Sequence, residues 1–284
     1  MSAREPLQAN ANRAGDGSRD ARALLATCVA AAVKGADAVR SHGQHLETLA
    51  WEEKSRADYV TAADRDSEHA IREVITARHR DAVVLGEELS PEVAAATLKT
   101  GLVFVVDPLD GTTNFLHGFP WYAVSIAAMC DGVLVASAIL NIANGDLFTA
   151  VAGGGARRSG QPIHVSKITE PIRSLFATGF PFKQADQVGQ YLRGFGAVMK
   201  EAAGVRRVGA ASLDLADVAC GRYEAFWELS LAPWDVAAGI LLVREAGGVV
   251  TDLEGRAAQI THTSIVAGNP RMQAWLLEMI GARG

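Results

Sequence analysis

The stretch VFVVDPLDGTTNF at residues 103–115 carries the strongest structural signal in the sequence. Its apolar start predicts a buried strand over residues 102–106 that ends at Asp107, because Pro108 has no N–H with which to continue a strand ladder. Asp110 follows three residues later, and the Gly-Thr-Thr segment after it is predicted to open a helical turn. The stretch therefore predicts two carboxylates that converge beside the N-terminus of a helix.

Such a pair of carboxylates has a chemical consequence. Like charges held this close raise each other's pKa unless a cation compensates them. Oxygen ligands without His or Cys favour Mg²⁺ over zinc, and the free N–H groups of the helical turn opened by Gly111-Thr112-Thr113 favour an anion. The stretch thus predicts a metal site next to an anion cradle, although a solvated surface turn can carry the same Asp-Pro-Leu-Asp-Gly sequence.

Three further acids occupy comparable positions. Glu87 follows a short apolar strand, Asp64 begins a helix predicted over residues 63–78, and Asp235 lies in the first turn of a helix predicted over residues 233–246. Each of these acids, taken alone, is also typical of a helix cap or a solvated carboxylate.

The spacing of apolar residues predicts the other elements of the chain. An amphipathic helix comes first, an antiparallel meander follows the 102–106 strand, and the second half alternates strands with helices, which indicates a layered α/β arrangement. These predicted elements are the helix at 20–45, the strands at 83–85, 123–129, 133–139, 147–151 and 175–178, the helices at 187–201 and 212–219, and the strands at 223–227 and 249–251.

A run of three glycines, Gly153-Gly154-Gly155, lacks the pattern of a phosphate-binding loop. We interpret it as a turn at a lobe boundary. The predicted organisation is a flexible tail at residues 1–20, an N-terminal α+β lobe with the metal-binding motifs at 21–155, and a C-terminal α/β lobe that completes the site at 156–284.

Composition excludes several classes of protein. The 284 residues are 49% hydrophobic and 21% charged, which is typical of a folded chain. A net charge of −5 lacks the basic footprint of a nucleic-acid-binding protein. Three widely spaced cysteines offer no disulfide framework, and neither a signal peptide nor an apolar run of membrane-spanning length is present. We expect a reduced, cytoplasmic protein without direct nucleic acid or membrane binding.

Together these segments resemble the inositol monophosphatase family. The family's three signatures are matched by Gly86-Glu87-Glu88, by residues 107–113 and by residues 234–239. The similarity extends from about residue 22 to residue 280 and looks closest to the bacterial inositol-1-monophosphatases. The resemblance implies an α/β (α+β) fold, the layered αβαβα sandwich of the inositol monophosphatase and fructose-1,6-bisphosphatase type.

The resemblance also implies a role for each acidic residue. Two or three Mg²⁺ ions would bind, two of them bridged by Asp107 and a third, weaker one near Glu87. The Thr112 hydroxyl, linked to Asp64, would help to deprotonate the attacking water. The implied metal ligands are Glu87, Asp107, the backbone carbonyl of Leu109, Asp110 and Asp235, and the implied catalytic residues are Glu87, Thr112 and Asp64.

Substrate contacts follow from the same resemblance. Backbone N–H groups would bind the phosphate, and a polyol ring would lie against acids that accept hydrogen bonds from its hydroxyls. Ala210 stands where relatives often carry a hydroxyl residue, which puts one ring contact in doubt. Lys54 matches a loop lysine of the family, and an exposed surface lysine is the alternative. The implied substrate contacts are Asp110, Gly111, Thr112, Gly209, Ala210, Ala211, Glu228 and Asp235.

The predicted function is that of a Mg²⁺-dependent phosphomonoesterase that hydrolyses inositol monophosphate and related sugar or polyol phosphates with a metal-activated water. Alternatives are a related phosphatase acting on histidinol phosphate, fructose-1,6-bisphosphate, NADP or 3'-phosphoadenosine 5'-phosphate, or a protein on the same scaffold that binds the transcription machinery. Arg193, Arg206 and Arg207 are candidates for a partner surface or for the homodimer that the resemblance implies. Lithium sensitivity is expected from the resemblance as well.

Overall fold

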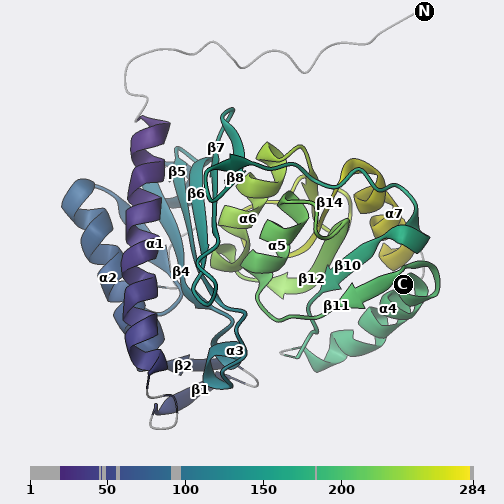
Figure 1. Cartoon of the computed structure of the whole chain (residues 1–284), viewed down its shortest axis with the longest axis horizontal. Coiled ribbons are helices and arrows are strands. Elements are labelled where there is room, and N and C mark those ends of the chain that lie inside the picture. The colour runs from purple at the N-terminus through teal and green to yellow at the C-terminus, as the bar shows by residue number, and fades with distance from the viewer. Residues whose placement is uncertain are drawn as a thin grey trace, which may run out of the picture.

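Two large β-sheets alternate with three pairs of helices in a layered sandwich, and a two-stranded sheet lies outside these layers (Figure 1). The computed structural model describes residues 20–44, 46, 49–55, 58–90, 97–182 and 184–281. The predicted fold class, an αβαβα sandwich, is confirmed.

The helices are α1 (Ala21–Gly43), α2 (Ala62–Arg78), α3 (Thr112–Leu116), α4 (Val188–Glu201), α5 (Ala211–Ala219), α6 (Pro233–Glu245) and α7 (Pro270–Gly281). The strands are β1 (Trp51–Ser55), β2 (Asp58–Thr61), β3 (Val83–Gly86), β4 (Leu102–Asp110), β5 (Ala123–Cys130), β6 (Val133–Asn141), β7 (Leu147–Val151), β8 (Gly155–Arg158), β9 (Gln161–Pro162), β10 (Leu175–Thr178), β11 (Gly204–Arg206), β12 (Ala225–Leu231), β13 (Val249–Thr251) and β14 (Thr263–Gly268).

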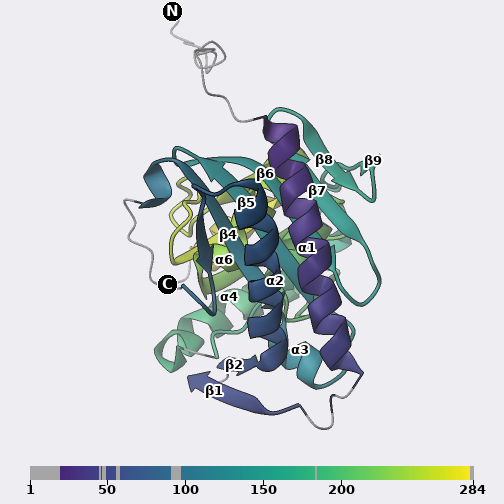
Figure 2. The ribbon, with the colours of Figure 1, turned by 90° about the vertical axis from the view of Figure 1, so that its left-hand side faces the viewer.

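The first sheet has seven strands in the order β3-β4-β5-β6-β7-β8-β9. β3 and β4 are parallel, and the other neighbours are antiparallel, as the meander predicted. α1 and α2 lie side by side over one face of this sheet (Figure 2). The core between these helices and the sheet contains Leu24 of α1, Ile71 of α2 and Phe104 of β4, which are all buried. A Cβ at Gly35 would lie 2.7 Å from Ser67 Oγ, so this glycine lets the two helices touch.

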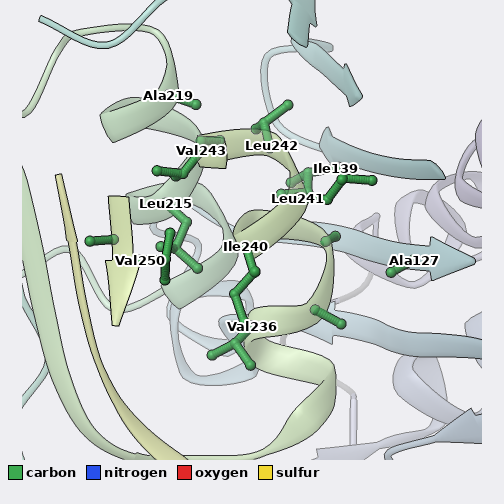
Figure 3. Packing of buried hydrophobic residues seen from close by; sticks show 14 of the residues in the cluster. Ala127, Ile139, Leu215, Ala219, Val236, Ile240, Leu241, Leu242, Val243 and Val250 are labelled. Carbon is green, nitrogen blue, oxygen red and sulfur yellow. The ribbon is translucent and has the colours of Figure 1, made fainter. Parts of the chain in front are cut away.

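The central layer consists of α5 and α6, which pack between the two sheets. Every residue of α5 is buried, as expected of a helix that is covered on all sides. Figure 3 shows Val236 and Ile240 of α6 pointing into the core that also holds Leu215 of α5. A Cβ at Gly239 would lie 2.4 Å from Leu215 Cδ1. Close packing therefore fixes the N-terminus of α6, which carries Asp235.

The second sheet has five strands in the order β11-β10-β12-β14-β13. β10 is parallel to β11 and β12, whereas β14 is antiparallel to both β12 and β13. α4 and α7 cover its outer face. The core beneath them contains the buried rings of Phe176, Tyr191 and Trp227.

One predicted boundary is wrong at the centre of the molecule. β4 does not end at Asp107 but continues through Pro108 to Asp110. The register shifts between Asp107 and Asp110, and Asp110 pairs with Ala123 beyond the irregularity. The missing N–H of Pro108 is tolerated because a bulge already interrupts the ladder there.

Other differences concern short strands. Lys54 does not lie in a loop after the first helix but in β1, which forms a hairpin with β2. The strand predicted at 223–227 begins and ends later, at Ala225 and Leu231. Gly153 lies in the turn between β7 and β8, as predicted, but the first sheet continues beyond it to Pro162 in β9. The division into two lobes at residue 155 stays a prediction. Throughout the described ranges, the helices are too short or too polar to cross a lipid bilayer.

Candidate active site

A cavity of about 480 Å³ opens beside the bulge of β4 and the start of α3. Four acids from three separate segments line it: Glu87 after β3, Asp107 and Asp110 in β4, and Asp235 in the first turn of α6. Each segment is fixed by packing, because β4 is buried along its whole length and α6 lies between the sheets. The fold therefore brings these four predicted site residues to one cavity.

The bulge of β4 is held by internal hydrogen bonds. The Leu109 N–H donates to Asp107 Oδ1 at 3.1 Å. The Ser212 N–H and hydroxyl both donate to Asp110 Oδ2, at 2.8 Å and 2.5 Å. Asp110 is thus anchored to the N-terminus of α5, where free N–H groups favour a negative charge. The sequence gave no reason to single out Ser212 as this anchor.

Asp64 lies behind Thr112 rather than in the cavity wall. Its Oδ2 accepts from the Thr61 N–H at 2.8 Å, so it does cap α2. Its Oδ1 accepts from the Thr112 hydroxyl at 2.9 Å, and the same hydroxyl lies 3.0 Å from the Leu109 carbonyl oxygen. Because Thr112 donates its single hydroxyl hydrogen to these acceptors, its oxygen is left to accept a hydrogen bond from a group in the cavity. Asp64 therefore caps α2 and also accepts the hydrogen bond of the Thr112 hydroxyl.

The turn that carries Glu87 rests on a buried carboxylate. Glu68 is fully buried and its Oε2 accepts from the Glu88 and Leu89 N–H groups at 2.8 Å and 3.2 Å. Arg72 Nε donates to Glu68 Oε1 at 2.9 Å. A Cβ at Gly86 would lie 2.0 Å from that same Oε1. The sequence analysis missed Glu68, although its place on the apolar face of the 63–78 helix was a signal that it is buried.

Lys54 reaches the site from the β1–β2 hairpin. Its ammonium group lies 2.9 Å from Glu87 Oε1 and 2.6 Å from Glu88 Oε1. Burial acts to lower the pKa of Lys54, but the two glutamates outweigh it and raise that pKa. Burial and the charge of Glu87 raise the pKa of Glu88 to about 7. A cation is therefore already held at Glu87.

The other acids repel one another. Burial, together with the charges of Glu87 and Asp110, raises the pKa values of Asp107 and Asp235 well above the ordinary range. Burial also raises the pKa of Asp110 to about 6, although the hydrogen bonds from Ser212 oppose the shift. No three His, Cys, Asp or Glu side chains in the described ranges are already close enough together to hold a metal ion.

The helix start beside these acids is also fixed. Gly111 has φ +92°, and a Cβ there would lie 3.0 Å from the Trp121 carbonyl oxygen, so only glycine fits. Asn114 Nδ2 donates to the Trp121 carbonyl at 2.7 Å and to the Val208 carbonyl at 3.0 Å. The segment that contains Gly209 is therefore tied to α3.

Among the residues predicted to contact a substrate, Gly209 lines the cavity together with Asp110, Gly111, Thr112 and Asp235. Ala210, Ala211 and Glu228 are not among the described residues of its wall. The Ala211 N–H forms a hydrogen bond with Asp110 that lowers the pKa of this carboxyl group. The Glu228 carboxylate lies against Gly179, where an added Cβ would be 1.9 Å from its Cδ.

A family model described as the inositol monophosphatase family matches residues 20–283. This chain belongs to the inositol monophosphatase family. The resemblance inferred from the three signatures is thereby confirmed.

Relatives of this inositol monophosphatase family member carry two kinds of name. This chain is 42% identical over 239 residues to a protein of Pseudomonas aeruginosa named Nus factor SuhB, and the match covers 84% of this chain and 88% of that protein. It is 41% identical over 258 residues to a protein of Rhizobium meliloti named inositol-1-monophosphatase, covering 91% and 96%. The solved structure of the extragenic suppressor protein SuhB from Bartonella henselae matches with a TM-score of 0.87 at 40% identity, covering 92% of this chain and all of that one.

The cavity of this inositol monophosphatase family member also has a wall that the sequence did not predict. Trp51, Tyr59, Phe182 and Arg207 line it together with the acids of β4. Trp51 and Tyr59 meet edge to face with ring centroids 4.8 Å apart. These residues come from the β1–β2 hairpin and from the segments after β10 and β11, and no local pattern links such distant positions.

Proposed function

We propose that this protein is a Mg²⁺-dependent phosphomonoesterase that hydrolyses inositol monophosphate and related sugar or polyol phosphates. The observation that carries the proposal is the meeting of Glu87, Asp107, Asp110 and Asp235 at one cavity beside the N-terminus of α3. Membership of the inositol monophosphatase family and the inositol-1-monophosphatase of Rhizobium meliloti support it.

The donor set suits a hard divalent cation. It consists of carboxylate oxygens without a neutral nitrogen or a thiolate, which favours Mg²⁺. Burial, together with neighbouring negative charges, raises the pKa values of Asp107, Asp110 and Asp235, and a bound cation would stabilise their ionised forms. We assign the ions to Glu87, Asp107, the Leu109 carbonyl, Asp110 and Asp235. Bound Mg²⁺ would supply the positive charge that activates a water and neutralises the phosphoryl oxygens.

The protein's own groups would position the phosphate and handle a proton. The N–H groups of Gly111 and Thr112 at the start of α3 would donate to the phosphate oxygens. The Thr112 oxygen would accept a hydrogen bond from the attacking water, and as that water loses its proton to Thr112, the hydroxyl proton of Thr112 would pass to the Asp64 carboxylate. Gly209 and Asp235 would face the polyol ring. Ring contacts from Ala210, Ala211 and Glu228 stay predictions from the resemblance, since these residues lie outside the described wall.

Phosphate release in the presence of Mg²⁺ tests the proposal. The wild-type protein is expected to release phosphate from inositol 1-phosphate only when Mg²⁺ is present. Asp110→Asn removes a ligand charge but keeps an acceptor for Ser212, so it should abolish turnover and leave the protein folded. Asp37→Asn, on the exposed side of α1, is the matched control and should remain active. A wild-type protein without Mg²⁺-dependent activity on any phosphomonoester would overturn the proposal.

A second candidate function is the binding of a component of the transcription machinery. It is favoured by the name Nus factor SuhB of the Pseudomonas aeruginosa relative. The two functions are separable, because Asp110→Asn should lose turnover but keep a partner. Binding of purified RNA polymerase by the wild type and by this variant, measured by surface plasmon resonance, would test it. The homodimer, the lithium sensitivity and the cytoplasmic location stay predictions.

A further inference from the structure

A second cavity, of about 760 Å³, lies beside the first residues of β4, whereas the acidic cavity lies at the other end of this strand. Its wall comes from the segment before β4, the β5–β6 turn, the end of α6, β13 and the 257–261 loop. Asp235 begins α6 at the acidic cavity, whereas Arg244 lies in the last turn of the same helix. The described walls of the two cavities share no residue. The second cavity is therefore separate from the site that the proposed function uses.

The charge of this second wall is opposite in sign to that of the whole chain. The chain has a net charge of −5. The described residues of the wall nevertheless include Lys99 and Arg244 and no acid. Both side chains are exposed, and no carboxylate in the described part of the chain forms an ion pair with either of them. The second cavity thus offers positive charge to a ligand.

One hydrogen bond orients the guanidinium group of Arg244. Its Nη2 donates to the Ala258 carbonyl oxygen at 3.0 Å. The Ala258 N–H donates in turn to the Val250 carbonyl at 3.3 Å, which ties this loop to β13. A guanidinium has five N–H donors, and the remaining donors of Arg244 have no carboxylate partner among the described residues. Arg244 is thus an oriented fork with donors left for an anion.

The end of α6 does not require these donors. The carbonyl oxygens of residues 242–244 accept hydrogen bonds from the backbone N–H groups of residues 246–248, so they are satisfied without the side chain. Burial by the surrounding protein lowers the pKa of Arg244. A bound anion would oppose this shift, because an opposite charge favours the charged form of the guanidinium.

Apolar side chains form much of the remaining wall. Met129 of β5, Leu134 of β6 and Val250 of β13 are buried, and Leu98 and Ile260 are half-buried. Such a wall removes the apolar surface of a ligand from water, and cavities of about 300–1,000 Å³ hold small organic molecules. The chemistry of the second cavity therefore suits an anion with an apolar body.

We propose that the second cavity binds an amphipathic organic anion, whose carboxylate or phosphate group contacts Arg244 and Lys99 and whose apolar body lies against the wall. Arg244 supplies oriented donors and Lys99 supplies a point charge. This site goes beyond the proposed phosphatase function and does not depend on it, because the two cavities have separate walls.

Calorimetric titration of the whole protein in Mg²⁺-free buffer tests the site, with octanoate, octyl phosphate and uncharged octanol as probes. The acids of the other cavity repel anions under these conditions. At least one anion is expected to bind about ten-fold more tightly than octanol, and the tighter anion identifies the head group. This preference should fall about ten-fold in Arg244→Met, because a charge-assisted hydrogen bond is lost. Equal binding of the anions and octanol by the wild type, or no binding of any probe at millimolar concentration, would overturn the inference.

Arg157→Met is the matched control. Arg157 also donates to a single carbonyl oxygen, that of Gly160 at 3.1 Å, and it is not part of the described wall of the second cavity. The preference for the anion should remain at the wild-type value in this variant. An equal fall in Arg157→Met and Arg244→Met would show a general effect of surface charge and overturn the inference.

A second variant keeps the test decisive if Arg244→Met does not fold. Val133 lines the same cavity and is 63% exposed, so Val133→Asp adds a negative charge to the wall without burying it. This variant should bind the anion several-fold more weakly and octanol as the wild type does. Unchanged anion binding by folded Val133→Asp would overturn the inference. A lower molecular mass of Val133→Asp in light scattering, with unchanged anion binding, would assign the cavity to a contact between copies instead.

Discussion

Replacing Gly86 with alanine is expected to destabilise the protein and to disturb the turn that carries Glu87. The added Cβ would lie 2.0 Å from Glu68 Oε1 and 2.4 Å from its Cδ. Glu68 is fully buried and bonded to Arg72 and to two backbone N–H groups, so its carboxylate cannot move without losing partners. Breaking a buried charged network of this kind costs about 3–5 kcal/mol.

The assay for this variant is thermal unfolding followed by circular dichroism in Mg²⁺-free buffer. At about 2–4 °C per kcal/mol for a large domain, Gly86→Ala should lower Tm by about 10 °C. Because Glu87 moves with the turn, the gain in Tm on adding Mg²⁺ should also shrink. Gly196→Ala is the control, since a Cβ there meets nothing within 4 Å on α4 and alanine favours the helix by up to about 1 kcal/mol. A Gly86→Ala protein with wild-type Tm and Mg²⁺ response would refute the reasoning.

Three other predictions concern the charges of the site. Without Mg²⁺, the pKa of Asp110 is raised to about 6 and that of Glu88 to about 7. Between pH 5 and pH 8 the folded protein therefore binds more protons than the unfolded chain. The free energy of unfolding should fall as the pH rises through this range. Urea titrations across this range check the trend, which Mg²⁺ should flatten, and a metal-free stability that rises with pH would contradict it. Ser212→Ala removes the hydroxyl donor to Asp110 and should lower the free energy of unfolding by about 1–3 kcal/mol; an unchanged urea midpoint would speak against this anchor. Lys54→Met removes the ammonium group from Glu87, so calorimetric titration should show tighter Mg²⁺ binding, and weaker binding would show that Lys54 does not compete with the ion.

The long helices and buried strands could be predicted because their periodicity is strong. The helices predicted at 20–45 and 63–78 correspond to Ala21–Gly43 and Ala62–Arg78. The β1–β2 hairpin was missed because Trp51–Ser55 is short and rich in charged residues, so its pairing depends on the tertiary structure. The continuation of β4 through Pro108 was missed for a related reason, since a bulge is a property of two paired strands.

Much of the candidate site followed from the three signatures, whereas its supports did not. Glu68 and Ser212 act on Glu87 and Asp110 across about 20 and 100 residues of sequence, through contacts that exist only in the folded chain. From the sequence, Arg207 was a candidate for a partner surface or a homodimer, together with Arg193 and Arg206. Its place in the cavity wall beside Phe182 exists only in the folded chain.

The most direct test of the account is to locate the metal itself. A crystal structure of the protein with Mn²⁺ in place of Mg²⁺ should show anomalous difference peaks in the cavity, within about 2.0–2.5 Å of oxygens of Asp107 and of the other acids assigned as ligands. Peaks elsewhere on the molecule, or an acidic cavity without a peak at saturating Mn²⁺, would contradict the claim that these carboxylates form a metal-dependent phosphatase site.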